Sequence, residues 1–399
     1  MRNFKLISFA LLLFLFPSIV NADSDIVADD SRVKSYLIGD FDNESILYEK
    51  NSDEPRPIAS MSKIMTYLLT MEDIDSGNIS METKVKVNSK SAELNAPGFS
   101  SLGLEEGMEI SVKKLLEGLM VVSGNDCARQ LAYVVGGNEK KFANLMNKKA
   151  KDLGLKTQKY YNASGITTDD GDQNTSSAKD LFKLSRYVIK KYPEVLKITK
   201  LTELDFSDIG IGRRETVIPL LGQLDGLDGL KTGTTDEAGY CFTSTVDMSK
   251  LDEDDEFRTI GVVMGADSHE VRESVTLDLV YYVSKYFNSQ LVLDKNSPYT
   301  DVKMNSVKAG YINLYPKKNL NLVVGVDKRP VSKVNVANNI KLPIKKGDVL
   351  GNVEITVDGN SYDEKLIAGK DEKEASQFSR VLRAFSDVCN LILDCFIAG

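Results

Sequence analysis

The sequence predicts an α/β (α+β) sandwich, in which helices flank an antiparallel sheet, followed by a small all-β domain and a terminal amphipathic helix. Its 399 residues suffice for two domains, at roughly 150 residues per domain. Strand patterns come first, then a block of helical patterns, then strands and another helix, an order typical of helices packed on an antiparallel sheet. Short strands punctuated by turn residues follow, and an apolar stripe at helical spacing ends the chain.

Residues 1–22 are predicted to be a secretory signal peptide. Arg2 and Lys5 supply a positive start, and Leu6–Val20 is an apolar run. The small residue Ala22 suits a cleavage site. The alternative is an uncleaved membrane anchor, although the run is short for a spanning helix. We therefore expect an exported protein at the outer face of the cytoplasmic membrane.

The first folded domain is expected over 23–292. Ser35–Tyr48 alternates around a turn at Asp40–Asn43, which predicts a pair of strands. Ser60 precedes an amphipathic helical run. The later elements are helices from Ser111, at Asp126–Val135, Glu139–Leu153 and Ser177–Lys191, strands at Gly239–Val246 and Thr259–Met264 joined by the acidic loop Asp247–Glu256, and a helix at Glu270–Phe287. These elements predict one sheet with helices packed against it.

A small all-β domain is expected over 293–369, with no residues that suggest a site. Its strands are predicted at Leu320–Val326, Val334–Val336, Ile340–Ile344, Val353–Val357 and Tyr362–Ile367. An amphipathic helix is expected over 370–399, starting near Asp371. We interpret it as an anchor at the membrane surface. The alternative is a helix packed on the protein's own β-domain.

Composition excludes several classes of function. The formal net charge is −8 and no basic tract interrupts it, so nucleic acid is not an expected partner. The four cysteines match no metal-site spacing, and we expect neither metal nor cofactor. The chain has a single histidine, His269, so a Ser-His-Asp triad or a Cys-His pair would have to use that residue. An enzymatic base is therefore expected among Lys, Asp, Glu or Tyr.

Three short motifs occur in order, namely Ser60-Met61-Ser62-Lys63, Ser123-Gly124-Asn125 and Lys231-Thr232-Gly233. Ser-x-x-Lys occurs four times in the chain. The copy at Ser31 lies in a polar stretch, and the copy at Ser111 caps a helix on which Lys113 and Lys114 form a solvated face, whereas Ser60 starts a helical run with its lysine beside it. There serine and lysine share one helix face, and free backbone N–H groups point toward the serine. Ser123 lies between two predicted helices, where a loop can present side chains to a cleft. This context selects these three motifs over the other copies.

These motifs resemble the signature of penicillin-binding proteins and class A β-lactamases, in which the second motif reads Ser-Asp-Asn. The segments Ile58–Thr66 and Gly229–Tyr240 resemble low-molecular-mass D-alanyl-D-alanine carboxypeptidases, as do Ser164-Gly165 and Asp170-Gly171. The trailing β-domain and the terminal amphipathic helix extend the resemblance over the mature chain. One departure is Glu215–Ile218, where the family often carries an asparagine-rich stretch, so these residues are assigned no role. The resemblance implies the penicillin-binding/β-lactamase-like fold and a pentapeptide substrate from peptidoglycan.

The chemistry needs no histidine. Ser60 is the expected nucleophile, and Lys63, if neutral, takes its proton. Burial and the nearby cation Lys231 would both lower the pKa of Lys63. Ser123 is expected to relay the proton to the leaving amine, and Asn125 to hold the substrate amide. β-Lactams would then bind covalently to the same serine.

The remaining site residues are expected to bind substrate. By resemblance, the backbone N–H groups of Ser60 and Thr234 form an oxyanion hole. Lys231, with Thr232, Gly233 and Thr234 on the same strand, would meet the terminal carboxylate. Arg272 resembles the family's carboxylate-binding arginine, and such a side chain can bind a carboxylate bidentately. The alternative for Arg272 is a surface arginine between Glu270 and Glu273.

Three other functions stay open. A serine β-lactamase needs a glutamate-activated water, yet Asp152–Asp172 contains no glutamate. A DD-endopeptidase would carry the same motifs. A penicillin-sensing or wall-binding protein without catalysis is opposed by the intact motif residues.

Overall fold

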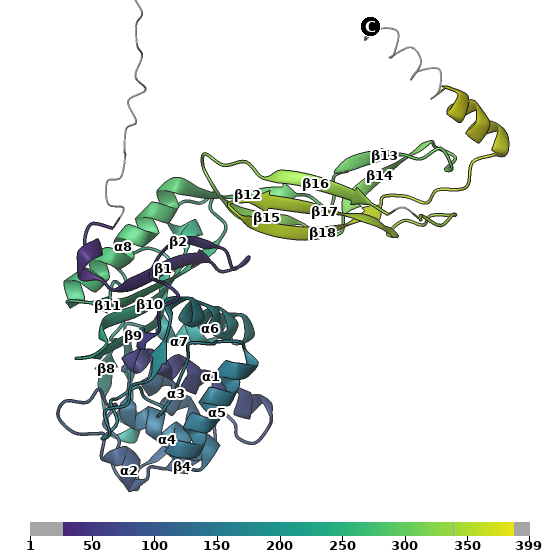
Figure 1. The fold of residues 1–399 in the computed structure, drawn as a ribbon. Coiled ribbons are helices and arrows are strands. Elements are labelled where there is room, and N and C mark those ends of the chain that lie inside the picture. Colours follow the sequence, from purple (N-terminus) through teal and green to yellow (C-terminus); the bar gives the residue numbers. More distant parts are fainter. Residues whose placement is uncertain (1–26, 338, 387–399) are drawn as a thin grey trace, which may run out of the picture.

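The computed structural model describes residues 27–337 and 339–386. The predicted signal peptide at 1–22 lies outside the described residues. The described chain forms a domain of sheet and helices and an elongated all-β domain, which extends from it beside α8 (His269–Tyr286) and β2 (Ile46–Lys50) (Figure 1). The fold class expected from the sequence is confirmed.

A five-stranded antiparallel sheet forms the centre of the first domain, with strand order β2-β1-β11-β10-β9. The predicted strand pair at the start of the chain and the pair joined by the acidic loop are both present. The first strand lies against β11, so distant parts of the sequence meet at the centre of the sheet. The bounds are β1 (Ser35–Asp40), β9 (Leu227–Thr235), β10 (Gly239–Asp247) and β11 (Arg258–Ala266).

Helix α8 covers one face of this sheet. The apolar residues Val271, Val275, Leu279 and Val283 are buried there, as their helical spacing predicts. Tyr286 continues the same helical spacing, but it is 41% exposed. The reason is its position, because the helix ends there and the chain continues into the β-domain.

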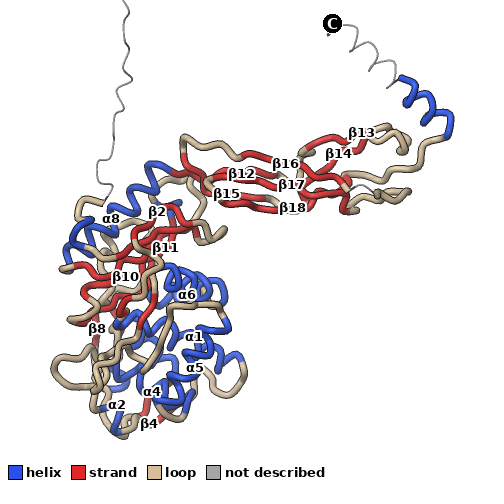
Figure 2. Tube along the Cα trace, in the orientation of Figure 1, coloured by secondary structure: helices blue, strands red, loops and turns tan. Residues whose placement is uncertain are grey.

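The remaining helices pack on the opposite face of the sheet, and Figure 2 shows them gathered below it. The main helices are α1 (Lys63–Asp75), α3 (Val112–Val121), α4 (Asn125–Gly136), α5 (Glu139–Asp152) and α6 (Ala178–Lys191). Two short helices are α2 (Ser89–Ala92) and α7 (Val195–Thr199). Ser111 and Ser177 accept backbone N–H groups at the starts of α3 and α6, which explains where these helices begin.

Three small strand pairs connect the loops of this domain. They are β3 (Arg56–Pro57) with β6 (Thr175–Ser176), β4 (Lys84–Lys86) with β5 (Glu109–Ser111), and β7 (Glu203–Asp205) with β8 (Arg213–Glu215). The first pair lies immediately before Ser60 and ties that segment to the chain after residue 174.

The β-domain contains a five-stranded sheet of order β13-β14-β18-β17-β16 and the pair β12-β15. Its strands are β12 (Phe287–Leu293), β13 (Thr300–Lys303), β14 (Tyr311–Pro316), β15 (Leu320–Gly325), β16 (Val331–Val336), β17 (Val349–Val357) and β18 (Asn360–Ala368). β12 follows α8 directly and pairs with β15, so this β-structure begins earlier than the residue 293 expected from the sequence. The predicted strand Ile340–Ile344 is wrong: only Ile344 bridges, to Glu372, and Pro343 has no N–H to donate.

The final helix begins at residue 377 in the described part of the chain, later than the Asp371 start that was expected. Glu372 and Glu374 form isolated bridges to Ile344 and Val307, so the segment before the helix belongs to the β-domain. The apolar side chains of the helix are solvent-exposed, namely Phe378, Val381, Leu382 and Phe385. Between residues 27 and 386, apart from 338, no helix is long and apolar enough to span a bilayer.

Candidate active site

Ser60 lies in a 3₁₀ turn, Ala59–Ser62, that runs directly into α1. Ala59 has a φ of 45°, a left-handed backbone conformation that is strained for a residue with a side chain. Ser62 holds this turn, because its Oγ donates to the carbonyl of Ala59 at 2.7 Å and accepts from Asn174 at 2.9 Å. The predicted helix start at Ser60 is therefore present and braced from a distant loop.

Lys63 is completely buried and contacts three oxygen atoms. Its Nζ lies 2.7 Å from Ser60 Oγ, 2.7 Å from Asn125 Oδ1 and 2.9 Å from the carbonyl oxygen of Ser164. The predicted Ser60–Lys63 pair is thus formed, and Asn125 joins it from α4.

These partners determine what a neutral Lys63 would do. The oxygens of Asn125 and Ser164 can only accept, so a neutral amine donates its two protons to them. Its lone pair then faces Ser60 Oγ, as a base requires. Burial lowers the pKa of Lys63 well below its ordinary value, and the charge of Lys231 lowers it further, while Asp126 opposes the shift.

Lys231 is the second buried cation, on β9. Its Nζ donates to the carbonyl of Thr232 at 3.2 Å. Burial, and then the positive charge of Arg272, lower the pKa of Lys231 to about 7. A bound carboxylate would raise this pKa again, because it favours the charged amine.

Gly233 lets β9 pass close to the nucleophile. A Cβ atom there would lie 2.6 Å from the carbonyl oxygen of Ile58 and 3.2 Å from the backbone nitrogen of Ser60. Neighbouring Thr232 is buried and Thr234 is exposed. The glycine of the Lys-Thr-Gly motif is therefore needed for space beside the Ser60 turn.

The loop carrying Ser123 is held by backbone contacts. Ser123 has a φ of 61°, and the N–H of Asn125 donates to the carbonyl of Ser100 at 2.8 Å. Asp126 was not predicted to matter, yet its carboxylate accepts the N–H groups of residues 102, 103 and 104, each at 3.0 Å. Among the described contacts Ser123 makes no side-chain hydrogen bond, so its hydroxyl remains available to a ligand.

Ser164 is a site residue whose role was missed. The sequence suggested it only as part of a resemblance, whereas its carbonyl binds Lys63. Asn162 shapes this loop by accepting the N–H groups of Ser164 at 3.1 Å and Gly165 at 2.7 Å. Gly165 has a φ of 86°, and a Cβ there would lie 1.8 Å from the carbonyl oxygen of Ala59. A backbone acceptor carries no signal of its own in a sequence.

Arg272 is buried in the first turn of α8 and is not a surface arginine. Its Nη2 lies 3.2 Å from Glu273 Oε1, while its Nε is buried without a partner. Burial lowers its pKa, and its charge acts on Lys231. His269 packs against Tyr240 with ring centroids 4.3 Å apart and the rings tilted by 60°, so the only histidine of the chain has a packing partner.

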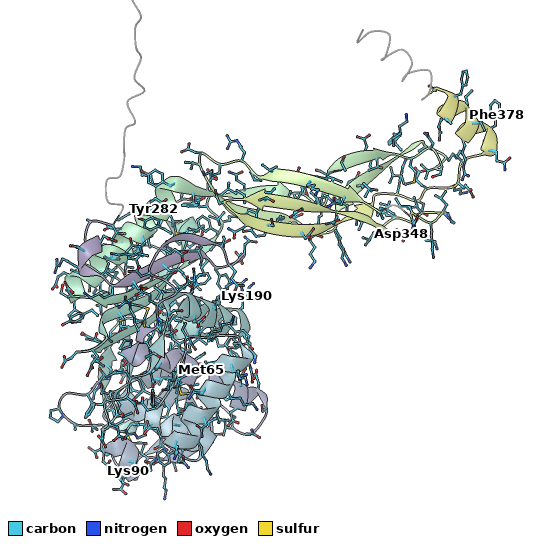
Figure 3. All side chains as sticks on the ribbon, viewed as in Figure 1. Met65, Lys90, Lys190, Tyr282, Asp348 and Phe378 are labelled. Atoms are coloured by element: carbon cyan, nitrogen blue, oxygen red, sulfur yellow. The ribbon has the colours of Figure 1, made fainter. Side chains whose placement is uncertain are left out.

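A cavity of about 420 Å³ adjoins the site and is lined in part by Thr234 and Thr235. A larger hollow of about 630 Å³ lies between α8 and the β-domain, and none of the predicted site residues lines it. Figure 3 labels Tyr282 at this junction and Met65 within the helical region. Within the described residues, no three His, Cys, Asp or Glu side chains gather as a metal site.

Known proteins match both domains of this chain. The family profile of D-alanyl-D-alanine carboxypeptidases matches residues 22–268. The carboxypeptidase DacF of Bacillus subtilis is 32% identical over 358 residues, which cover 88% of each chain. This chain belongs to the D-alanyl-D-alanine carboxypeptidase family. The profile of the C-terminal domain of penicillin-binding protein 5 matches residues 287–374.

Solved structures of penicillin-binding proteins extend this likeness to three dimensions. Penicillin-binding protein 5 of Haemophilus influenzae is 25% identical with a TM-score of 0.71, covering 86% of this chain and 98% of that one. Penicillin-binding protein D2 of Listeria monocytogenes, solved with cefotaxime bound, is 33% identical with a TM-score of 0.56, covering 63% and 96%. The expectations of a serine-type carboxypeptidase and of β-lactam binding are confirmed at the level of the family.

Proposed function

We propose that this carboxypeptidase releases the terminal D-alanine of peptidoglycan pentapeptides through an acyl-enzyme on Ser60. The observation that carries the proposal is the buried Lys63 amine, whose Nζ lies 2.7 Å from Ser60 Oγ and contacts two further oxygens, of Asn125 and Ser164, that can only accept. This geometry supplies a base within hydrogen-bond reach of the nucleophile and needs no histidine.

Acylation begins when Ser60 Oγ attacks the carbonyl carbon of the penultimate D-alanine and its proton passes to Lys63. The backbone N–H groups of Ser60 and Thr234 stabilise the resulting oxyanion. The C–N bond to the last residue then breaks. Ser123 passes the proton from Lys63 to the nitrogen of the leaving group. D-alanine therefore departs with a neutral amine, and the rest of the peptide remains esterified to Ser60.

Water completes the reaction in the reverse sense. It attacks the ester carbonyl while Lys63 accepts its proton, and the proton returns to Ser60 Oγ as the acyl group leaves. The side-chain nitrogen of Asn125 is directed to the substrate amide, because its oxygen is already used by Lys63.

Recognition of the free carboxylate rests on the cations beyond Ser60. Lys231 is the direct partner, with the hydroxyl groups of Thr232 and Thr234 beside it. Arg272 adds positive charge from α8. A bound carboxylate would keep Lys231 protonated despite its lowered pKa, and that charge in turn keeps Lys63 neutral.

The proposal is tested with a pentapeptide ending in D-Ala-D-Ala. Mass spectrometry should detect loss of one D-alanine, and fluorescent penicillin should label Ser60. Ser60→Ala should abolish both. Undiminished labelling of that variant would refute the assignment of the nucleophile, and equal rates on free-acid and amidated peptides would favour an endopeptidase instead.

Export and membrane attachment are proposed alongside this activity. The signal peptide directs the chain outward, the catalytic domain of 23–292 acts on the wall, and the helix within 370–399 lies on the membrane surface. Support comes from the exposed apolar side chains of the helix, notably Phe378, Leu382 and Phe385. On the polar side of the helix, Arg383 holds the helix to the β-domain by donating to the carbonyls of Val307 at 2.7 Å and residue 308 at 2.8 Å.

Deleting 377–399 should release the protein from membranes and leave kcat/KM on a soluble peptide within about twofold, because the deletion spares the bridging residues Glu372 and Glu374. Fractionation and a peptide assay measure both effects. If the truncated chain binds neutral membranes as well as the full chain does, the helix is not the anchor.

A further inference from the structure

Charge is segregated between the two domains. Residues 27–286 contain 32 lysines and arginines against 43 aspartates and glutamates, a formal net charge of −11. Residues 287–399 contain 16 against 13, a formal net charge of +3. An anionic surface would therefore repel the catalytic domain and attract the β-domain.

The positive charge gathers at the end of the β-domain that carries the terminal helix. Three segments meet there, at 303–310, 341–348 and 369–374, and we call them the basic rim. The bridges Val307–Glu374 and Ile344–Glu372 join them. Five rim lysines are exposed and have no carboxylate partner in the described structure, namely Lys308, Lys341, Lys345, Lys346 and Lys373.

The carboxylates of the rim are already engaged. Asp348 accepts the backbone N–H of Lys345, and Asp371 accepts that of Lys346, each at 2.8 Å. Glu372 pairs with Lys370 at 3.0 Å, and Glu374 pairs with Arg380. The acidic groups thus support the turns of the rim, and the lysines are left to face solvent.

The rim adjoins the exposed apolar side of the helix. Figure 3 labels Asp348 and Phe378 toward the same end of the molecule, opposite Tyr282. Arg383 joins the two surfaces, because its guanidinium donates to carbonyls of the rim. Tyr311 is 47% exposed at this end, with the Lys370 amine 5.9 Å from its ring centroid. An exposed tyrosine beside lysines suits the polar layer of a bilayer.

We infer that the basic rim binds anionic phospholipid headgroups and acts with the helix as the second of two membrane-binding signals. The inference rests on the proposed membrane attachment of the helix and adds a role for the β-domain. A single amphipathic element or lipid chain binds reversibly, whereas an apolar insertion combined with a polybasic patch holds firmly. The acidic catalytic domain would then be held away from the bilayer.

The expected effect is large enough to measure. A lysine near an anionic membrane strengthens binding on the order of fivefold, and the effect fades within about 10 Å at ordinary ionic strength. Removing five such lysines should therefore weaken binding to anionic vesicles by at least about tenfold. Lysines set farther back on the same domain should contribute much less.

The test compares the mature chain with two variants of equal charge. The rim variant carries Lys→Gln at the five rim lysines, and the set-back variant carries Lys→Gln at Lys317, Lys318, Lys328, Lys333 and Lys365, which are also exposed. Co-sedimentation uses phosphatidylcholine vesicles with and without phosphatidylglycerol, at low and high salt. Unfolding midpoints establish that both variants fold.

Selective loss by the rim variant supports the inference. It should bind neutral vesicles like the parent, lose the gain from phosphatidylglycerol, and lose its salt dependence, while the set-back variant keeps both. Equal behaviour of the two variants would overturn the inference. So would a rim variant that binds vesicles normally but is no longer retained by an anionic wall polymer.

Failure of the anchor gives a different result. If deleting 377–399 leaves binding to neutral vesicles unchanged, the helix is not the anchor. Binding of that truncated chain to phosphatidylglycerol vesicles that still depends on the rim lysines would support the rim by itself. The parent could instead bind vesicles through its helix without binding more tightly when phosphatidylglycerol is present. That result would refute the inference about the rim and leave the helix as the anchor.

Discussion

The two ends of this molecule use lysine in opposite ways. In the catalytic domain, Lys63 and Lys231 are completely buried, and both have lowered pKa values. At the far end of the β-domain, Lys345 and Lys346 are exposed, and their side chains have no carboxylate partner there. Desolvation disfavours a charged amine, so burial makes a base, whereas exposure preserves a charge that can attract an anionic surface.

Position, not residue type, decides the chemistry of a lysine in this molecule. Lys63 needs Ser60 one helical turn away and two acceptors from distant segments, Asn125 and Ser164. The exposed lysines need only a shared surface. Substitution of either buried lysine should therefore impair activity, whereas almost any single substitution of an exposed lysine should leave activity unchanged.

The largest effect is expected from Lys63→Arg, which keeps hydrogen-bond donors at this position and removes the base. A guanidinium stays protonated in proteins and cannot accept the Ser60 proton. Acylation by penicillin should slow by about 10²–10⁴, the usual contribution of a general base. The acylation rate is measured by stopping the reaction with fluorescent penicillin at successive times. Ser60→Ala serves as the control that is not labelled.

A structural role for Lys63 would look different. In the parent, acylation should rise with pH through the lowered pKa of Lys63, because only the neutral amine is a base. Lys63→Arg should lose this rise. An unchanged acid limb in a folded variant would show that another group takes the proton.

An intermediate effect is expected from Arg272→Ala. The kcat/KM on the pentapeptide should fall by an amount equivalent to about 1.5–3 kcal/mol of transition-state stabilisation, the scale of a charged hydrogen bond. β-Lactam acylation should fall less if the lactam relies mainly on Lys231. Amidating the peptide should produce a similar loss, and the two changes together should not add, because both remove one interaction.

The pH profile separates contact from electrostatics. Carboxylate binding needs protonated Lys231, so kcat/KM should fall as pH rises through a pKa of about 7. The charge of Arg272 lowers that pKa, so Arg272→Ala should move this alkaline limb to higher pH. A limb that stays in place would mean that Arg272 does not act on Lys231.

The smallest effect is expected from Lys317→Gln and Lys318→Gln, which change exposed lysines outside the rim and the site. Peptide kcat/KM should stay within about twofold, and the free energy of unfolding should change by less than about 0.5 kcal/mol. Steady-state kinetics and urea denaturation provide the measurements. A loss of kcat/KM as large as that of Arg272→Ala would contradict the distinction between buried and exposed lysines.

Much of the fold could be predicted from local patterns. The helices after Ser111, Asn138 and Ser177 have strong periodicity and a capping residue, so their limits were nearly correct. β12, β13 and β14 were missed, and Ile340–Ile344 was wrongly predicted as a strand. A strand in a small β-domain depends on which neighbour it pairs with, and a single sequence does not contain that information.

The sequence by itself determined which residue types carry the chemistry and their order along the chain. The motifs at Ser60, Ser123 and Lys231 are local, and a single histidine excluded the common bases. Only the tertiary structure decided that Ser164 supplies a carbonyl to Lys63, that Arg272 is buried, and that the terminal helix exposes its apolar side. The physical reason is that burial, and the pKa shifts it causes, arise from contacts between distant segments.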